Sequence, residues 1–184
     1  MIYFTSDPHL FHDREFIWKP RGFSSEKEMR ESFLNEWMST VSKEDDVYVI
    51  GDFCLGQDKE AIRELVSALP GRIHLIIGNH DTPAKIQIYE SLPNVVEIAY
   101  ATVITYKKRQ YYLSHYKTET SNLEANPWTC VVNLHGHIHT KQVFADDKPY
   151  NINVSVDAQR GKIVSIEQIR EMFKSKVEEC ASYL

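Results

Sequence analysis

Cysteine is scarce in this sequence, and its placement does not suggest a disulfide framework. The 184 residues contain three cysteines, Cys54, Cys130 and Cys180, which lie far apart and form no Cys-x-x-Cys pair. Small secreted domains held together by disulfides contain an even and denser set of cysteines. We therefore expect free thiols and a protein of a reducing compartment, the cytoplasm.

Long apolar runs and an excess of positive charge are also missing. No run approaches the ~18 apolar residues of a membrane-spanning helix, and the N-terminus lacks the basic and apolar segments of a secretion signal. The formal net charge is −5, whereas duplex-binding proteins present a broad basic face. We expect no membrane partner and no duplex nucleic acid. A nucleotide substrate stays open, because bound cations can supply positive charge locally.

The composition is that of a globular protein. Hydrophobic residues make up 42% of the chain and charged residues 26%, which are ordinary proportions for a folded domain. The length suits one compact core, and the chain has no internal repeat or obvious linker. We therefore predict a single domain over residues 1–184.

Apolar runs alternate with helical patterns in the first half of the chain, and mostly strands follow. The spacing predicts helices over residues 24–41, 58–71 and 165–180, with Ser25 and Glu28, Asp58, and Ser165 and Gln168 as N-terminal capping residues. Residues 95–115 are predicted to form a longer strand, a polar turn at 107–109 and a return strand. The pattern indicates an α/β fold with mixed sheets and outer helices.

Five apolar runs each end in residues that can bind a metal. These residues are Asp7 with His9, Asp52, Asn79 with His80, His115, and His137 with His139. In open α/β sheets, sites form at the carboxyl ends of strands. We therefore expect the five strand ends to meet at one polar site.

The candidate ligands are carboxylates, imidazoles and an amide, without a thiolate. Such a set suits Mn, Fe, Zn, Co or Ni better than Ca or Mg, and we favour manganese. About seven candidate ligands are too many for one tetrahedral zinc ion, but they suit two ions that share a carboxylate. Two ions about 3.5–4 Å apart can clamp a phosphate during hydrolysis.

The order of these residues resembles the signature of the calcineurin-like metallophosphoesterase superfamily. The signature blocks appear as Asp7-Pro8-His9, Gly51-Asp52, Gly78-Asn79-His80-Asp81, the single His115, and Gly136-His137-Ile138-His139. The match runs from the first strand to the late strand at 150–157, and the chain is most similar to small single-domain phosphoesterases of bacteria and their phages. Pro8 and Ser155 are departures that affect local loop geometry at most.

The resemblance implies a four-layer αββα sandwich, in which two mixed β-sheets are flanked by helices and a dinuclear metal site lies at the carboxyl ends of the strands. One metal would be held by Asp7, His9, Asp52 and His139, and the other by Asp52, Asn79, His115 and His137. Asp52 would bridge the ions. The implied reaction is hydrolysis of a phosphodiester or phosphomonoester, of a small molecule or nucleotide, by a metal-bridging hydroxide.

The resemblance also implies roles beside the metals. His80 would lie outside the coordination shell and face the phosphate or leaving group, with Asp81 orienting it. Asn79, His80 and His12 are the candidates for substrate contact. We expect His135 to pack or to orient a ligand, and His74 to be structural.

Two alternative functions remain open from the sequence. One is a metal-binding interaction scaffold without catalysis, against which His80 and the full ligand set argue. The other is a nuclease on the same site, against which the acidic charge and small size argue. Substrate specificity is expected in the loops at 10–24 and 116–128, where Trp18, Arg21 and Phe23 could line the mouth of a pocket.

Overall fold

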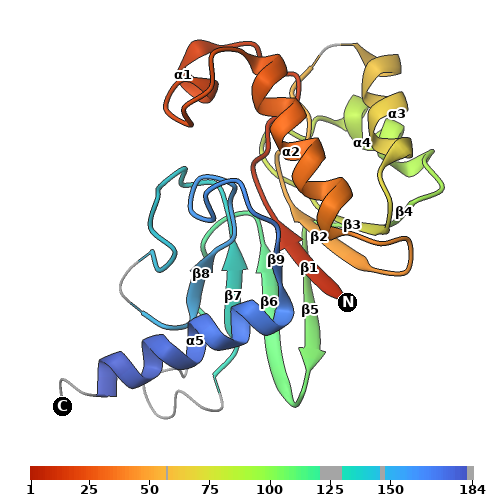
Figure 1. The fold of residues 1–184 in the computed structure, drawn as a ribbon. Helices are drawn as coiled ribbons and strands as arrows, with labels where there is room; N and C mark the ends of the chain where they lie inside the picture. The colour runs from red at the N-terminus through yellow and green to blue at the C-terminus, as the bar shows by residue number, and fades with distance from the viewer. Residues whose placement is uncertain (57, 121–129, 146–147, 182–184) are drawn as a thin grey trace.

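The computed structural model describes residues 1–56, 58–120, 130–145 and 148–181, which form two β-sheets with helices around them (Figure 1). The first sheet has the order β4-β3-β2-β1-β9. Its strands are β1 (Ile2–Thr5), β2 (Asp46–Ile50), β3 (Arg72–Ile76), β4 (Val95–Ala99) and β9 (Val164–Ser165). The first four strands run parallel, and β9 pairs antiparallel with β1.

The second sheet has the order β5-β6-β7-β8. Its strands are β5 (Ala101–Tyr106), β6 (Arg109–Ser114), β7 (Val132–His135) and β8 (Asn151–Asn153). The pair β5–β6 is an antiparallel hairpin, whereas β6, β7 and β8 are parallel. Both sheets are therefore mixed, as expected.

The described helices are α1 (Glu15–Trp18), α2 (Glu26–Thr40), α3 (Lys59–Ala68), α4 (Pro83–Glu90) and α5 (Ile166–Ala181). Helices α2, α3 and α4 gather on one side of the first sheet, and α5 lies near the second sheet (Figure 1). None of these helices, within the part of the chain that the structure describes, is long and apolar enough to cross a membrane.

Alternating side chains of β2, in the first sheet, pack into two hydrophobic cores, one on each face of the sheet. Val47 and Val49 of β2 pack with the α2–α4 helices. Tyr48 and Ile50 point the other way and pack against the second sheet and α5. This period of two is what a strand buried on both faces requires. The fold is thus the expected one, two mixed sheets flanked by helices.

The predicted helix starts are confirmed. Ser25 accepts a hydrogen bond from the N–H of Glu28, and Asp58 accepts from the N–H groups of Glu60 and Ala61. Ser165 and Gln168 form a reciprocal pair, with N···O distances of 2.7 and 3.2 Å. These side chains satisfy backbone donors that have no partner within the helix.

The prediction of one long strand over 95–106 is wrong. The segment breaks at Tyr100, which is 79% exposed. The residues before it form β4 in the first sheet, and those after it form β5 in the second. Apolar residues continue through the break, so the pattern alone does not reveal it. Helix α4 was not predicted either, although Pro83 at its first turn is a typical start signal.

The topology positions the candidate ligands. Because β1, β2 and β3 are parallel, their carboxyl ends lie at one edge of the first sheet. The parallel strands β6 and β7 end in the same way in the second sheet. The residues predicted to bind metal follow these five ends.

Candidate metal centre

Short turns after the strands are joined to one another by backbone hydrogen bonds. The N–H of Asp7 donates to the carbonyl of Gly51 at 3.1 Å, and that of His9 donates to the carbonyl of Asp52 at 3.2 Å. In the second sheet, the N–H of Gly136 donates to the carbonyl of His115 at 3.1 Å. These bonds hold each ligand-bearing turn against its neighbour.

Five candidate ligands have left-handed backbone conformations. The φ angles are 56° at Asp7, 52° at His9, 55° at Asp52, 69° at His137 and 43° at His139. Residues other than glycine rarely adopt this region, and it is associated with functional sites where the surrounding fold holds the strain. The clustering is a structural sign of function that is independent of the motifs.

Two glycines allow the turns to pack closely. At Gly136, a Cβ atom would overlap the side chains of Ser6 and Asp7. At Gly51, where φ is +88°, it would overlap the His115 ring. Glycine is therefore needed at these two positions because any side chain would collide with neighbouring residues of the site. This reason adds to the backbone freedom that we expected from the sequence.

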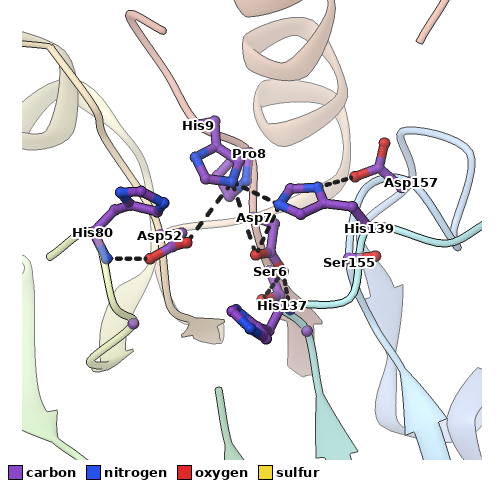
Figure 2. Close-up of polar contacts among 12 residues, drawn as sticks. Ser6, Asp7, Pro8, His9, Asp52, His80, His137, His139, Ser155 and Asp157 are labelled. Carbon is purple, nitrogen blue, oxygen red and sulfur yellow. Dashed lines mark hydrogen bonds and ion pairs between the residues drawn. The ribbon is translucent and has the colours of Figure 1, made fainter. Parts of the chain in front are cut away.

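One group of ligand atoms comprises those of Asp7, His9 and His139. The Nε2 atoms of His9 and His139 are 3.0 Å apart. Asp7 Oδ1 is 3.9 Å from the first nitrogen and 3.7 Å from the second. Figure 2 shows the two rings directed toward one another beside Asp7.

A second group comprises Asp7, Asp52 and His115. His115 Nε2 is 3.5 Å from Asp52 Oδ2 and 2.9 Å from Asn79 Oδ1. Its other ring nitrogen, Nδ1, is 3.0 Å from the carbonyl oxygen of Ile50. A carbonyl can only accept, so Nδ1 is the donor in its contact with Ile50, and Nε2 is the ring nitrogen that faces Asp52 and Asn79 and would bind a metal.

Asp52, a member of the second group, also approaches the first group. Its Oδ2 is 3.8 Å from His9 Nε2 and 3.5 Å from His115 Nε2. Its Oδ1 accepts a hydrogen bond from the backbone N–H of His80 at 2.8 Å. This arrangement is the one that a carboxylate shared by two ions would need.

The chemistry of the donors fits bound cations. Asp7 is fully buried, and its Oδ1 has no hydrogen-bond partner among the described residues. Burial raises the pKa of Asp7, because a buried carboxylate without compensation is costly. A divalent ion would supply that compensation. Burial, together with the nearby His139 and Arg21, lowers the pKa of His9 to about 2, so this imidazole is neutral, which is the ligand form.

Asp157, which no sequence motif indicated, supports His139. Asp157 Oδ2 is 2.8 Å from His139 Nδ1. Both carboxylate oxygens accept hydrogen bonds from Arg21, at 2.9 and 2.8 Å. Burial alone would raise the pKa of Asp157, but the hydrogen bonds from His139 and Arg21 outweigh it, and the pKa lies well below its usual range. A carboxylate behind a histidine orients its ring and raises its basicity.

His80 and His12 lie at the open side of the centre. His80 is exposed, and its ring centroid is 5.6 Å from that of His9. The ring of the half-buried His12 is 5.8 Å from His9. Neither belongs to a ligand group. Both rings therefore lie near the candidate ligand His9, which is compatible with the substrate contacts that we predicted.

Asp81 does not have the contacts that we expected. Its Oδ2 accepts hydrogen bonds from the backbone N–H groups of Asp52 and Gly78, at 2.8 and 2.9 Å. Within the described part of the chain, no hydrogen bond joins it to the ring of His80. Asp81 therefore holds the Asp52 turn against the Gly78 turn, and its link to His80 runs through the backbone.

The remaining histidines occupy three different settings. The ring of His137 packs 5.0 Å from that of His115, and its backbone N–H donates to Asp7 Oδ2 at 2.9 Å. Its ring nitrogens lie outside both ligand groups, so its ligation stays a prediction. His135 is buried, outside both groups. His74 lies far along β3, between Asp46 and Glu97 at 2.9 and 2.7 Å, and is structural as expected.

Comparison with known proteins agrees with this geometry. The sequence model of the calcineurin-like phosphoesterase superfamily domain matches residues 2–162. The chain belongs to this superfamily. All of the candidate metal ligands lie within the matched residues 2–162.

Relatives of this calcineurin-like phosphoesterase come from archaea, bacteria and phages. It is 31% identical over 182 residues to an uncharacterised protein of Methanocaldococcus jannaschii, covering 96% of this chain and 93% of the relative. It is 28% identical over 197 residues to the gene 66 protein of Mycobacterium phage L5, covering 92% of each. A crystal structure of a protein of unknown function from Aquifex aeolicus superposes with a TM-score of 0.72 and 26% identity, covering 94% of this chain and 98% of that one.

Proposed function

We propose that this calcineurin-like phosphoesterase is a single-domain cytoplasmic enzyme that hydrolyses a phosphodiester or phosphomonoester of a small molecule or nucleotide. It would use two divalent transition-metal ions, with manganese favoured over Fe, Zn, Co and Ni. The small number of cysteines, with no Cys-x-x-Cys pair among them, supports a reducing location.

The observation that carries this proposal is that the Asp52 carboxylate, a member of the second group, also approaches a ligand atom of the first group. Its Oδ2 is 3.8 Å from His9 Nε2 and 3.5 Å from His115 Nε2. Asp7, His9, Asp52 and His139 would hold one ion, and Asp52, Asn79, His115 and His137 the other, so that Asp52 is shared. When bound, such ions polarise the phosphoryl group and supply a nucleophile from water at neutral pH.

The protein would contribute positioning and proton transfer. His80 is held at the open side by its backbone bond to Asp52 Oδ1, so its ring can reach a phosphate beside the ligands. We assign it the role of stabilising phosphate charge or donating a proton to the leaving oxygen. Asp81 would act as a positioning residue, because it keeps the turns that carry Asp52 and Asn79 together.

The test is turnover coupled to metal content. Protein stripped with a chelator should lose activity on nitrophenyl phosphodiesters and monoesters, and should regain it on addition of about two equivalents of Mn²⁺ or another of these ions. His74→Gln is the matched control, because it removes a histidine remote from the centre and should leave turnover intact. Two bound ions without turnover on any phosphate ester would identify a scaffold. Activity confined to oligonucleotides would identify a nuclease.

A further inference from the structure

A cavity of about 550 Å³ lies beside the candidate metal centre. Its walls come from the segment at 20–23, from α2 and from the turn at 156–162, and none of the candidate metal ligands lines it. The volume is within the range of about 300–1,000 Å³ that small-molecule sites occupy. The cavity is therefore large enough to hold an organic group.

The cavity shares a wall with the metal centre. Arg21 and Asp157 line it, and both also contact the ligand-bearing elements. Arg21 donates to the carbonyl of Asp7 at 3.0 Å and to that of Pro8 at 3.2 Å, while Asp157 contacts His139 Nδ1. Asp157 therefore connects the cavity to His139, a member of the first ligand group, and Figure 2 shows Asp157 on the side of the His139 ring that faces away from His9.

The inner part of the cavity is apolar. It is lined by the buried Pro8, Met29 and Phe33, and by Phe23 and Val156. An aromatic or hydrocarbon group would gain free energy by leaving water for such a surface. The inner lining thus favours the organic part of a ligand over a bare inorganic ion.

The rim is basic, although the chain as a whole is acidic. The lining contains four basic residues, Arg21, Lys141, Arg160 and Lys162, and two acidic ones, Glu36 and Asp157. Arg21 pairs with Asp157, and Lys162 pairs with Glu36 at 2.7 Å. Lys141 and Arg160 are exposed, and within the described ranges no ion pair engages either. Two cations are therefore available at the rim in a chain whose net charge is −5.

We propose that this cavity is the substrate-recognition pocket of the enzyme. It holds the non-reacting end of the phosphate ester, a ring-bearing or hydrocarbon group with a second negative charge that meets Lys141 and Arg160. Lys141 follows His139 by two positions and Arg160 follows Asp157 by three, so both cations belong to segments that also form the metal centre. This inference rests on the proposed function, because the reacting phosphate must lie at the metals.

The kinetic test compares two substrates that differ by one anion. Thymidine 5′-(4-nitrophenyl phosphate) is measured with and without a 3′-phosphate. The 3′-phosphate should lower KM for the wild type, and the double variant Lys141→Gln/Arg160→Gln should remove about 10-fold of that advantage, the effect expected for losing charge-assisted hydrogen bonds. Lys43→Gln, which changes an exposed lysine outside the cavity, is the control and should leave the ratio of the two KM values unchanged.

A binding measurement separates this inference from the proposed function. Calorimetry with thymidine 3′,5′-bisphosphate on metal-stripped protein needs no turnover, and the double variant should bind about 10-fold more weakly than Lys43→Gln. Equal binding by both variants would overturn the pocket assignment even if the enzyme hydrolyses phosphate esters. Weakened binding without any change in the ratio of KM values would also overturn it, because the site would then bind an effector instead of the substrate.

Discussion

The Nε2 atoms of His9 and His139 lie 3.0 Å apart, although the two residues are separated by 130 positions in the sequence. Each ring has a second nitrogen, and Nδ1 of His139 contacts Asp157, which directs the Nε2 lone pair toward His9. Two imidazole nitrogens at this distance can share a cation. The relationship joins the first and the last motif of the chain into one site.

Asp52→Asn should remove bound metal and activity together. The shared position needs a negative charge to hold two cations close, and an amide does not supply it. We expect metal content, measured by mass spectrometry after dialysis, to fall from about two ions per chain, with turnover at background. Two tightly held ions with ordinary turnover would sink the two-metal assignment.

His80→Ala should separate catalysis from metal binding. The ring of His80 belongs to neither ligand group, so most of the metal should stay bound, while kcat should fall roughly 10²–10⁴-fold, the usual scale for acid–base catalysis. Metal content and kcat are measured on the same samples. Complete loss of metal would show that His80 is a ligand or its direct support.

The leaving group distinguishes two roles for His80. If it mainly donates a proton, the loss in kcat should be smaller for nitrophenolate than for an alkoxide leaving group. If it mainly stabilises charge on the phosphate oxygens, the two losses should be similar. A variant with wild-type turnover on both substrates would remove His80 from the mechanism.

Asp157→Asn should weaken metal binding about 10–100-fold, as loss of a partner behind a ligating histidine does. The amide can still contact His139 but no longer pairs with the Arg21 guanidinium. Titration of the stripped protein with Mn²⁺ measures the change, and we expect one of the two binding steps to weaken more than the other. Asp58→Asn is the control, because asparagine also caps a helix well. An unchanged titration would show that Arg21 and Asp157 do not position His139.

The strand ends and helix starts could be predicted because each depends on residues close together in the sequence. Asp52 directly follows a buried run and a glycine, and parallel pairing then places it beside Asp7. The helix starts at Ser25 and Ser165 depend only on capping hydrogen bonds within the first turn of each helix. In both cases the local pattern and the global fold agree.

The parts that could not be predicted depend on tertiary structure. Asp157 is a single acid in a loop, and its contact with His139 exists only because β7 and β8 are neighbours. The change from the first sheet to the second at Tyr100 is not visible in the sequence, because β4 and β5 have similar apolar content. Left-handed φ angles at Asp7 and His9 could not be predicted from the sequence, because aspartate and histidine adopt this region more often than most residues but still do so at a small minority of positions.

Stability below neutral pH should depend on Asp46. Hydrogen bonds from Arg72 lower the pKa of Asp46 from 3.8 to about 2; burial opposes this shift and His74 adds to it. A carboxyl group with a lowered folded pKa contributes stability that is complete above its unfolded pKa and is lost as pH falls toward the folded value.

The free energy of unfolding of Asp46→Asn should therefore be lower than that of the wild type at pH 6, by no more than about 1 kcal/mol because the pair is partly exposed. The difference should shrink as pH falls from 5 to 3. Urea unfolding of chelator-treated protein at these pH values measures it. A difference that grows toward pH 3 would contradict the assigned direction.

The left-handed backbone conformations at the candidate metal ligands lower the stability of the folded protein. Each strained position costs folding free energy of order 1 kcal/mol or more. Packing in the two hydrophobic cores must offset this cost, whether or not a substrate is bound. Glycine would relieve the backbone at His137 or His139, whose φ angles are 69° and 43°, but would delete the imidazole. A screen for heat tolerance alone should therefore enrich such replacements and yield sturdier proteins that hydrolyse nothing.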